Sequence, residues 1–491
     1  MSKHNYFVIF LKKINLSVNS LLEKYLNKLN FSNLSNIGRS NKVFLTFAIL
    51  IVLFLSYLSI PYTYDKVKIS QELESQLLDK FKLNFIFSKD INYNFFPRPH
   101  FIIHDSAIIE NHVRVSDIKK ISVYVSLNNL LSLKGLVVSN IILENSNFNL
   151  NKKNSNFFIK LLNNNFLKNS LNIKNSNIFF RDNEQEVLFI SKIINMKYYY
   201  DAKELKNIIK SENEIFNIPY SFRLYRDKIK KKLISKINLN FLGIEIKNSI
   251  DYNADKKRGL ASIIYNKNKS EISYNWDKNY FNFIHSDQSN NPKFFYKGNI
   301  NFSPFYSIIE GNTDKINLSN SLFSQLLKTE ILNNKNLNID LNINTKEIIQ
   351  LKNFIDIILN LKIQEGLIDI DHTKFNWRDY AEFKILDSLF YVSENQLILD
   401  GKLFVKVKDY EKIYRSLQVP KNLRPEVKKL EFLFKYNFDQ QIIDFQAIKI
   451  NNQINKKVNN FLKKIILKKD KYQNKIYLKN IMKKVIAAYV G

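Results

Sequence analysis

Histidine and carboxylate side chains that fall close together in the chain are the first candidates for chemistry. His100 and His104 have the i, i+4 spacing that would place two metal ligands on one face of a helix. They follow Pro99, however, in a stretch whose alternating apolar residues predict a strand, where residues four apart lie about 13 Å from each other. His112 comes later in the same region. We interpret all three as ordinary histidines.

Asp369, Asp371 and His372 form a second candidate cluster. On a strand the two carboxylates would share one face, most simply a solvated one. The sequence contains no glycine-rich phosphate loop, serine nucleophile elbow or zincin helix. The nucleophile or metal ligands that an envelope hydrolase would need are therefore not found. It also has no cysteine, which excludes disulfides and thiolate chemistry. We predict no catalytic residues, no metal ligands, no cofactor and no enzymatic activity.

The charge of the chain is strongly basic, with 75 Lys and Arg against 45 Asp and Glu. A basic chain can bind nucleic acid or an anionic membrane, or can have no specific partner. No basic stripe interleaved with glycine or aromatics appears, and no zinc, homeodomain or RNA-binding signature. Abundant Lys, Asn, Ile, Phe and Tyr with only 9 Gly and 8 Pro indicate the codon bias of an AT-rich genome. Nucleic acid is therefore not an expected partner.

An unbroken apolar run from Val43 to Ile60 carries no charge and ends at Pro61. Roughly 18 to 20 helical residues cross a hydrocarbon core about 30 Å thick, so we predict a single transmembrane anchor over residues 43–62. A cleaved signal peptide is the alternative, but it would lie nearer the start and end in a small-residue cleavage site. The anchor residues are Val43, Phe44, Leu45, Leu50, Ile51, Leu53, Phe54, Leu55 and Ile60.

The flanks of this run predict its direction. Residues 1–42 hold seven basic residues and one acidic residue, whereas residues 65–80 hold three lysines and four acids. Basic residues stay on the cytoplasmic side during insertion. We expect a basic cytoplasmic tail over residues 1–42, with everything past Pro61 exported.

Beyond the anchor the sequence predicts a mainly β protein with flanking helices. Apolar residues alternate with Asn, Lys and Ser over many short stretches, a pattern typical of antiparallel sheet packed on one face only. Asn-Gly and Asp-Gly turns are few, so hairpin boundaries are poorly marked. The helices we expect after an amphipathic one near residues 69–81 are 157–168, 204–216, 321–332, 410–417 and 454–466, with a last one at 472–490. That last helix has an apolar face beside lysines and could cap the sheet or touch a membrane.

One ordered set of motifs follows the anchor: a strand broken by two prolines, a leucine-rich turn ending near a glycine, and a strand containing Leu-Glu. The residues that carry it are Phe95, Phe96, Pro97, Pro99, Leu130, Leu131, Gly135, Leu143 and Glu144. This set resembles the amino-terminal module of the AsmA family, over roughly Pro61 to Leu150. One departure is Ile109-Glu110-Asn111-His112, which stands where many members have a glycine-bearing turn.

The resemblance implies a protein of the bacterial inner membrane with its bulk in the periplasm. It implies an elongated, taco-like antiparallel β-groove that carries phospholipid toward the outer membrane and supports envelope integrity. The divisions expected are an AsmA-like module over 63–150, a β-rich groove over 151–453 and a basic amphipathic helical region over 454–491. The lipid-facing candidates are Ile91, Tyr93, Phe95, Ile121, Val123, Val125, Leu337, Ile339 and Leu341.

Periodicity alone does not choose between a groove and a compact sandwich, because both alternate in the same way. Phospholipids, the inner membrane and an envelope protein at the distal end are the expected partners. The alternative function is a non-enzymatic assembly factor or scaffold for outer-membrane proteins, in which exposed strand edges would pair with client strands.

Overall fold

The structure is a computed structural model that describes residues 39–490, except 165, 183–184, 228, 252–256, 266–267, 278–279, 286–293, 303, 317–333 and 350–352. The helix expected at 321–332 therefore lies outside the described residues. So do residues 1–38 of the tail that we expect to be cytoplasmic. The chain divides into a smaller unit, Met1–Tyr64 with Leu127–Gly135, and a larger unit, Asp65–Ser126 with Leu136–Gly491.

The smaller unit is the apolar helix with the loop that contacts its end. It contains α2 (Arg39–Ser59), η2 (Ile60–Thr63) and η3 (Leu133–Gly135). The Tyr57 hydroxyl donates to the Leu127 carbonyl at 2.7 Å and accepts from the Leu130 N–H at 3.0 Å. The Tyr64 hydroxyl donates to the Leu130 carbonyl at 2.5 Å. Two tyrosines thus hold the leucine-rich turn against the carboxyl end of the apolar helix.

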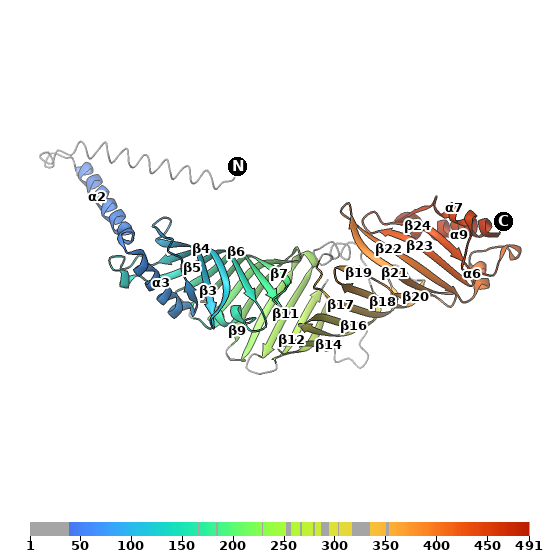
Figure 1. The fold of residues 1–491 in the computed structure, drawn as a ribbon, viewed down its shortest axis with the longest axis horizontal. Coiled ribbons are helices and arrows are strands. Elements are labelled where there is room, and N and C mark those ends of the chain that lie inside the picture. The colour runs from blue at the N-terminus through green and yellow to red at the C-terminus, as the bar shows by residue number, and fades with distance from the viewer. Residues whose placement is uncertain are drawn as a thin grey trace. The chain divides into compact units, whose positions relative to one another are not determined.

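The larger unit is built on one sheet with 26 strands among the described residues. Successive strands join the same sheet side by side, almost all antiparallel, in a solenoid-like arrangement (Figure 1). The first strands are β1 (Asn84–Ile86), β2 (Ile91–Asn94), β3 (His100–Glu110), β4 (Val113–Val125), β5 (Val138–Leu150), β6 (Ser170–Arg181), β7 (Val187–Asp201), β8 (Lys206–Ile215), β9 (Ile218–Asp227), β10 (Lys232–Leu239), β11 (Ile244–Asp251), β12 (Lys257–Tyr265) and β13 (Asn268–Trp276). The others are β14 (Tyr280–His285), β15 (Phe294–Phe302), β16 (Phe305–Ile316), β17 (Ile339–Ile348), β18 (Phe354–Gln364), β19 (Leu367–Asp369), β20 (Lys374–Trp377), β21 (Ala381–Ser393), β22 (Gln396–Val407), β23 (Lys429–Asn437), β24 (Ile442–Ile450), β25 (Gln453–Ile454) and β26 (Ile466–Lys468).

Two junctions in this sheet are parallel: β5 with β6 and β16 with β17. A parallel junction requires the chain to return along the strand before it re-enters the sheet. The first return contains α4 (Phe157–Lys160) and η4 (Leu161–Asn163). It lies on the sheet, because the Tyr198 hydroxyl donates to the Phe158 carbonyl at 3.1 Å. The helix expected over 157–168 is therefore present only in its first part.

The helix predicted at 204–216 is absent from that position. Strand β8 occupies it and pairs antiparallel with β7 and β9 along its whole length. Two polar side chains face the core beside the buried Ile209: Ser211 and Asn213 are at most 2% exposed, and the Ser211 hydroxyl donates to Asn213 Oδ1 at 2.7 Å. Polar residues at core positions interrupt the apolar alternation, which explains why the strand was mistaken for a helix.

Two-residue loops with positive φ connect several hairpins. Asn111 and His112 join β3 to β4 with φ of 51° and 63°, at the place where a glycine turn was expected. Glu394 and Asn395 join β21 to β22 in the same way. Asparagine tolerates the left-handed region better than most residues. These turns explain how the sheet forms hairpins with so few glycines.

The amino-terminal part of the larger unit has a helix-covered core. Helix α3 (Lys66–Phe81) begins at Asp65, whose side chain accepts from the Lys68 N–H, and it buries Ile69, Leu73, Leu77 and Phe81. Phe81 contacts Phe166, which contacts Tyr198 of β7, with ring centroids 6.2 and 5.7 Å apart. The helix and the first return therefore cover the same face of the sheet.

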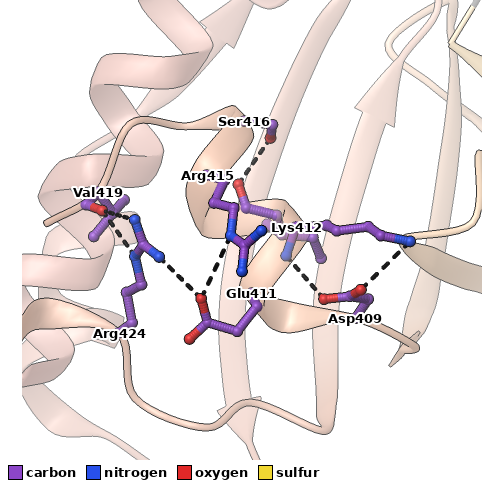
Figure 2. A network of polar contacts seen from close by, with 8 residues as sticks. Asp409, Glu411, Lys412, Arg415, Ser416, Val419 and Arg424 are labelled. Carbon is purple, nitrogen blue, oxygen red and sulfur yellow. Dashed lines mark hydrogen bonds and ion pairs between the residues drawn. The ribbon is translucent and has the colours of Figure 1, made fainter. Parts of the chain in front are cut away.

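The carboxyl-terminal part has its own helices: α6 (Tyr410–Ser416), α7 (Lys456–Leu462), α8 (Lys469–Gln473) and α9 (Lys475–Val490), with the short turn η7 (Lys421–Leu423). Helix α9 packs on the sheet, since Val485 and Tyr489 contact the core cluster around Ile448. Figure 2 shows the polar network at α6, where Arg424 joins Glu411 at 2.9 Å and donates twice to the Val419 carbonyl. The helix expected at 410–417 is present as α6, and the one expected at 472–490 is present as α9 from Lys475. The helix expected at 454–466 is present only over Lys456–Leu462, between β25 (Gln453–Ile454) and β26 (Ile466–Lys468).

Candidate functional site

One face of the sheet carries apolar side chains in register across consecutive strands. On β9 to β12, Phe222 lies opposite Ile237, Ile237 opposite Ile246, and Ile246 opposite Ile263. The same face continues through β13 to β18. We call the following residues of this face the open face: Tyr220, Phe222, Leu224, Ile237, Leu239, Ile244, Ile246, Ile263, Ile272, Tyr274, Phe281, Phe283, Tyr296, Ile300, Ile309, Ile339, Leu341, Ile343, Leu359 and Leu361.

The open face continues the face that is covered in the amino-terminal part. Ile209 of β8 lies opposite both Tyr198 and Leu224. Tyr198 of the covered part and Leu224 of the open face therefore lie on the same side of the sheet. On the covered side of this boundary, Phe101, Ile121 and Tyr198 are fully buried. On the other side, most residues of the open face are only half-buried. The face therefore stays apolar where its cover ends.

Large aromatic rings lie close to glycines within the open face. A Cβ atom on Gly259 would fall 2.1 Å from the Tyr274 ring, and one on Gly298 would fall 2.4 Å from the Phe283 ring. Tyr274 also contacts Phe281, with ring centroids 4.9 Å apart. Glycine allows this close approach because it has no side chain. The aromatic residues thus pack down against the sheet.

Hydroxyl groups on this face are paired with neighbouring strands. The Tyr274 hydroxyl donates to Asn248 Oδ1 at 2.5 Å, and burial raises the pKa of Tyr274 to about 12. The Tyr296 hydroxyl shares a hydrogen bond with Ser270 at 3.0 Å, and burial raises the pKa of Tyr296 as well. Both tyrosines stay neutral at physiological pH. Their polar atoms are satisfied, which leaves the rings as apolar surface.

The opposite face of the same strands is charged and solvated. Lys236 and Lys247 both pair with Glu245, at 2.7 and 3.0 Å, and these two contacts lower the pKa of Glu245. Lys297 pairs across β15 and β16 with Glu310 at 2.9 Å. Exposed pairs of this kind add little stability, because water screens their charges. One face of these strands is thus polar and solvated, whereas the other is apolar.

The lipid-facing candidates from the sequence fall into different surroundings. Five lie in the covered core and are at most 6% exposed: Ile91, Tyr93, Ile121, Val123 and Val125. Phe95 is half-buried beside the proline break. Leu337 is buried in a core cluster with Phe390 and Leu399, and Ile339 of the open face packs against this cluster. Leu341 also belongs to the open face. In the sequence, apolar and polar residues alternate in 237–241 and 272–276, and this alternation is the feature that indicates further residues of the open face.

The motif residues have structural roles in each unit. In the smaller unit, Leu130 is buried, Leu131 is 68% exposed and Gly135 packs on Asn129. In the larger unit, Leu143 is buried and Glu144 pairs with Lys120 at 2.7 Å. The proline break places Phe95, Phe96, Pro97 and Pro99 between β2 and β3.

The apolar helix of the smaller unit is exposed around its circumference. Val43, Phe44, Leu50, Ile51, Leu53, Phe54 and Leu55 are all large apolar side chains with more than a third of their surface exposed. Among the described residues, Val43–Thr63 is the one helix that is long and apolar enough to cross a membrane. Leu45 and Ile60 lie in the same segment and are half-buried.

The candidate chemical groups do not converge on a site. His100 stacks on Tyr124 and its Nδ1 lies 2.8 Å from the Arg98 carbonyl. Asp371 lies in a turn after β19, where it accepts from the Ser388 N–H at 2.7 Å, so it does not share a solvated strand face with Asp369. Across the described ranges no group of three or more His, Cys, Asp or Glu side chains could hold a metal ion.

A pocket does exist elsewhere, between the end of α3, the β3–β4 hairpin and η4. Its lining includes Lys82, His112 and an ion pair between Lys160 and Glu110. Its volume is about 450 Å³, and the residues that line it add no nucleophile or metal ligand set to the candidates above. The comparison with known proteins gives no further assignment: no protein-family model and no curated protein matches this chain.

Proposed function

We propose that this protein is a membrane-anchored, non-enzymatic carrier of phospholipid, of the AsmA type, and that the open face bears the acyl chains. The observation that supports this is the apolar register over ten strands, β9 to β18, whose side chains stay half-buried. Contiguous exposed apolar surface of this extent marks a binding surface in a soluble domain. Ten strands at about 4.8 Å spacing give roughly 45 Å of apolar contour along the sheet.

The two faces of these strands suit a phospholipid better than a wholly apolar ligand. Acyl chains gain about 0.8 kcal/mol for each buried CH₂ group, so several carbons on the open face provide substantial affinity. The headgroup stays in water at the margin of the face. The hydroxyls of Tyr274 and Tyr296 are hydrogen-bonded, so these two rings meet the acyl chains without an unsatisfied hydroxyl. Such binding forms and breaks no covalent bond, which agrees with the scattered histidines and carboxylates.

The apolar helix α2 is the basis for the cellular location that we propose for this carrier. We infer that α2 spans the bacterial inner membrane with the basic residues 1–42 in the cytoplasm and the sheet in the periplasm. Lipid would enter from the inner membrane and move along a taco-like groove formed by the open face. An envelope protein at the distal end would complete the path to the outer membrane.

The experiment is lipid mass spectrometry on the full chain purified in mild detergent. Replacing the cross-strand neighbours Ile246 and Ile263 by Asp (I246D with I263D) places two charges on the open face. The matched control, N275D with N282D, adds two charges at a cross-strand pair on the solvated face, where both side chains are exposed. We expect the unsubstituted chain to retain phospholipid, the control to retain as much, and the open-face variant to lose most of it.

Two results would contradict the proposal. One is a chain that retains no phospholipid when a parallel preparation of a known lipid carrier does. The other is equal retention by the two double variants. Unfolded β-barrel proteins co-purifying with a lipid-free chain would instead support the assembly-factor function.

A further inference from the structure

The carboxyl-terminal edge of the sheet carries an unusual concentration of positive charge. Residues 454–491 contain eleven lysines and a single acidic residue, Asp470. One carboxylate in this segment does not neutralise eleven ammonium groups. The segment therefore presents a local excess of positive charge at the end of the larger unit, where α7, α8 and α9 pack together.

The charge is densest around strand β26, at Lys463-Lys464-Ile465-Ile466-Leu467-Lys468-Lys469. Strand β26 pairs with the start of β24. Leu467 is 5% exposed and Ile465 packs on the neighbouring core cluster, so these two point inward. Ile466 is 54% exposed between the two lysine pairs, and all four lysines are exposed. We call Lys463, Lys464, Ile466, Lys468 and Lys469 the basic edge.

Further apolar side chains are exposed in the same segment. Ile454 in β25 is 68% exposed and Ile476 in α9 is 73% exposed. Lysines alone would serve to keep an edge strand from pairing with other chains, but that role requires no exposed isoleucine. A nucleic acid would bind the lysines and gain little from the isoleucines. An anionic lipid surface uses both, because the ammonium groups attract its headgroups while the apolar side chains enter the interface.

We propose that the basic edge docks on a membrane surface rich in anionic phospholipid. The chain then contacts lipid at two places: through α2 near its start and through the basic edge near its end. This contact is separate from the open face, because the residues involved lie on different strands. Docking depends on headgroup charge, whereas acyl-chain binding depends on the apolar register.

The test uses the full chain held in nanodiscs of phosphatidylcholine, which carry no net charge to compete. The nanodiscs are mixed with vesicles of phosphatidylcholine alone or with added phosphatidylglycerol, and bound protein is measured by flotation. One variant replaces the four lysines of the basic edge by Gln (K463Q, K464Q, K468Q, K469Q). The control replaces four exposed strand lysines elsewhere by Gln (K119Q, K192Q, K210Q, K374Q).

We expect binding to the anionic vesicles only, reduced about tenfold or more in the basic-edge variant and little changed in the control, since each lysine near such a surface contributes about 1 kcal/mol. A single I466S variant, which keeps all the charges, should also weaken binding and serves if the fourfold variant fails to fold. The proposal is overturned if vesicles with and without phosphatidylglycerol bind alike, or if control and basic-edge variants lose equally. It is also overturned if the I466S variant binds anionic vesicles normally and a nucleic-acid fragment binds the basic edge as tightly as those vesicles do. Lipid retained on the open face is unaffected by any of these outcomes.

Discussion

The amino-terminal and middle parts of the sheet have the same apolar face in different states of cover. Between β2 and β7 that face lies beneath α3 and the α4–η4 return, and Phe101 and Ile121 have no exposed surface. Between β9 and β18 the equivalent face keeps Phe222 and Ile246 half-buried. Among the described residues, η5 (Asn240–Leu242) is the only helical turn within β9 to β16. The covered part is a core, whereas the middle part leaves similar apolar side chains half-exposed.

The largest difference we expect between the two parts is in stability. Ile121→Ala removes a fully buried side chain and leaves a cavity, which should lower the free energy of unfolding by about 3 kcal/mol. Ile246→Ala, on the open face, should cost about 1 kcal/mol because less surface is buried and water can fill the space. Urea unfolding of the full chain in detergent, followed by circular dichroism, gives both values. Equal losses would show that the open face is as well covered as the core.

A second difference concerns glycines on the open face itself. Gly259→Ala would push the Tyr274 ring off the sheet, whereas Gly311→Ala meets its nearest atom only at 3.7 Å. We expect a cost of about 1–3 kcal/mol for the first and close to none for the second. Thermal melts of the two variants make a matched pair. If both melt like the unsubstituted chain, the rings are not packed on the sheet and the face has no fixed shape.

The smallest effect we predict is at Asp369 in β19, next to the last strand of the open face, where it pairs with Lys362 on the other side of the sheet. Burial raises the pKa of Asp369 above its usual 3.8. A raised pKa in the folded state means that this carboxyl contributes stability at low pH and loses it as pH rises through that pKa. Asp369→Asn keeps an acceptor for the Asp371 N–H and removes the charge. The variant should melt slightly higher than the parent at pH 7, and the difference should disappear below pH about 4. A lower melting temperature at pH 7 would contradict this reasoning.

The strands that the sequence predicts correctly are those in which apolar and polar residues strictly alternate, such as 272–276. In 237–241 the strand ends at Leu239, and Phe241 lies in η5. Strand β8 was missed because Ser211 and Asn213 take core positions and pair with each other. The hairpins were hard to place because Asn111 and Asn395 adopt backbone angles that usually indicate glycine. At each of these positions a polar residue stands where an apolar residue or a glycine is usual. A search for period-two alternation does not detect such positions.

The candidate site was harder to predict than the fold. Period-two alternation identifies a one-sided strand, but not whether a helix covers the apolar side. Cover depends on contacts such as Phe81–Phe166 and Phe166–Tyr198, the first of which joins residues more than 80 positions apart in the chain. The parallel junction of β16 with β17 also had no sequence signal. Five of the nine lipid-facing candidates consequently lie in the covered core.

The most direct test of the central claim is photocrosslinking in native membranes with benzoylphenylalanine placed singly along the sheet. Phe222 and Phe283 sample the open face, Phe101 the covered core, and Tyr280 the solvated side of β14, where it is 43% exposed. We predict phospholipid adducts at Phe222 and Phe283, and none at Phe101 or Tyr280. Adducts absent from the open face, or equally abundant at Tyr280, would contradict the account of this face as the lipid-bearing surface.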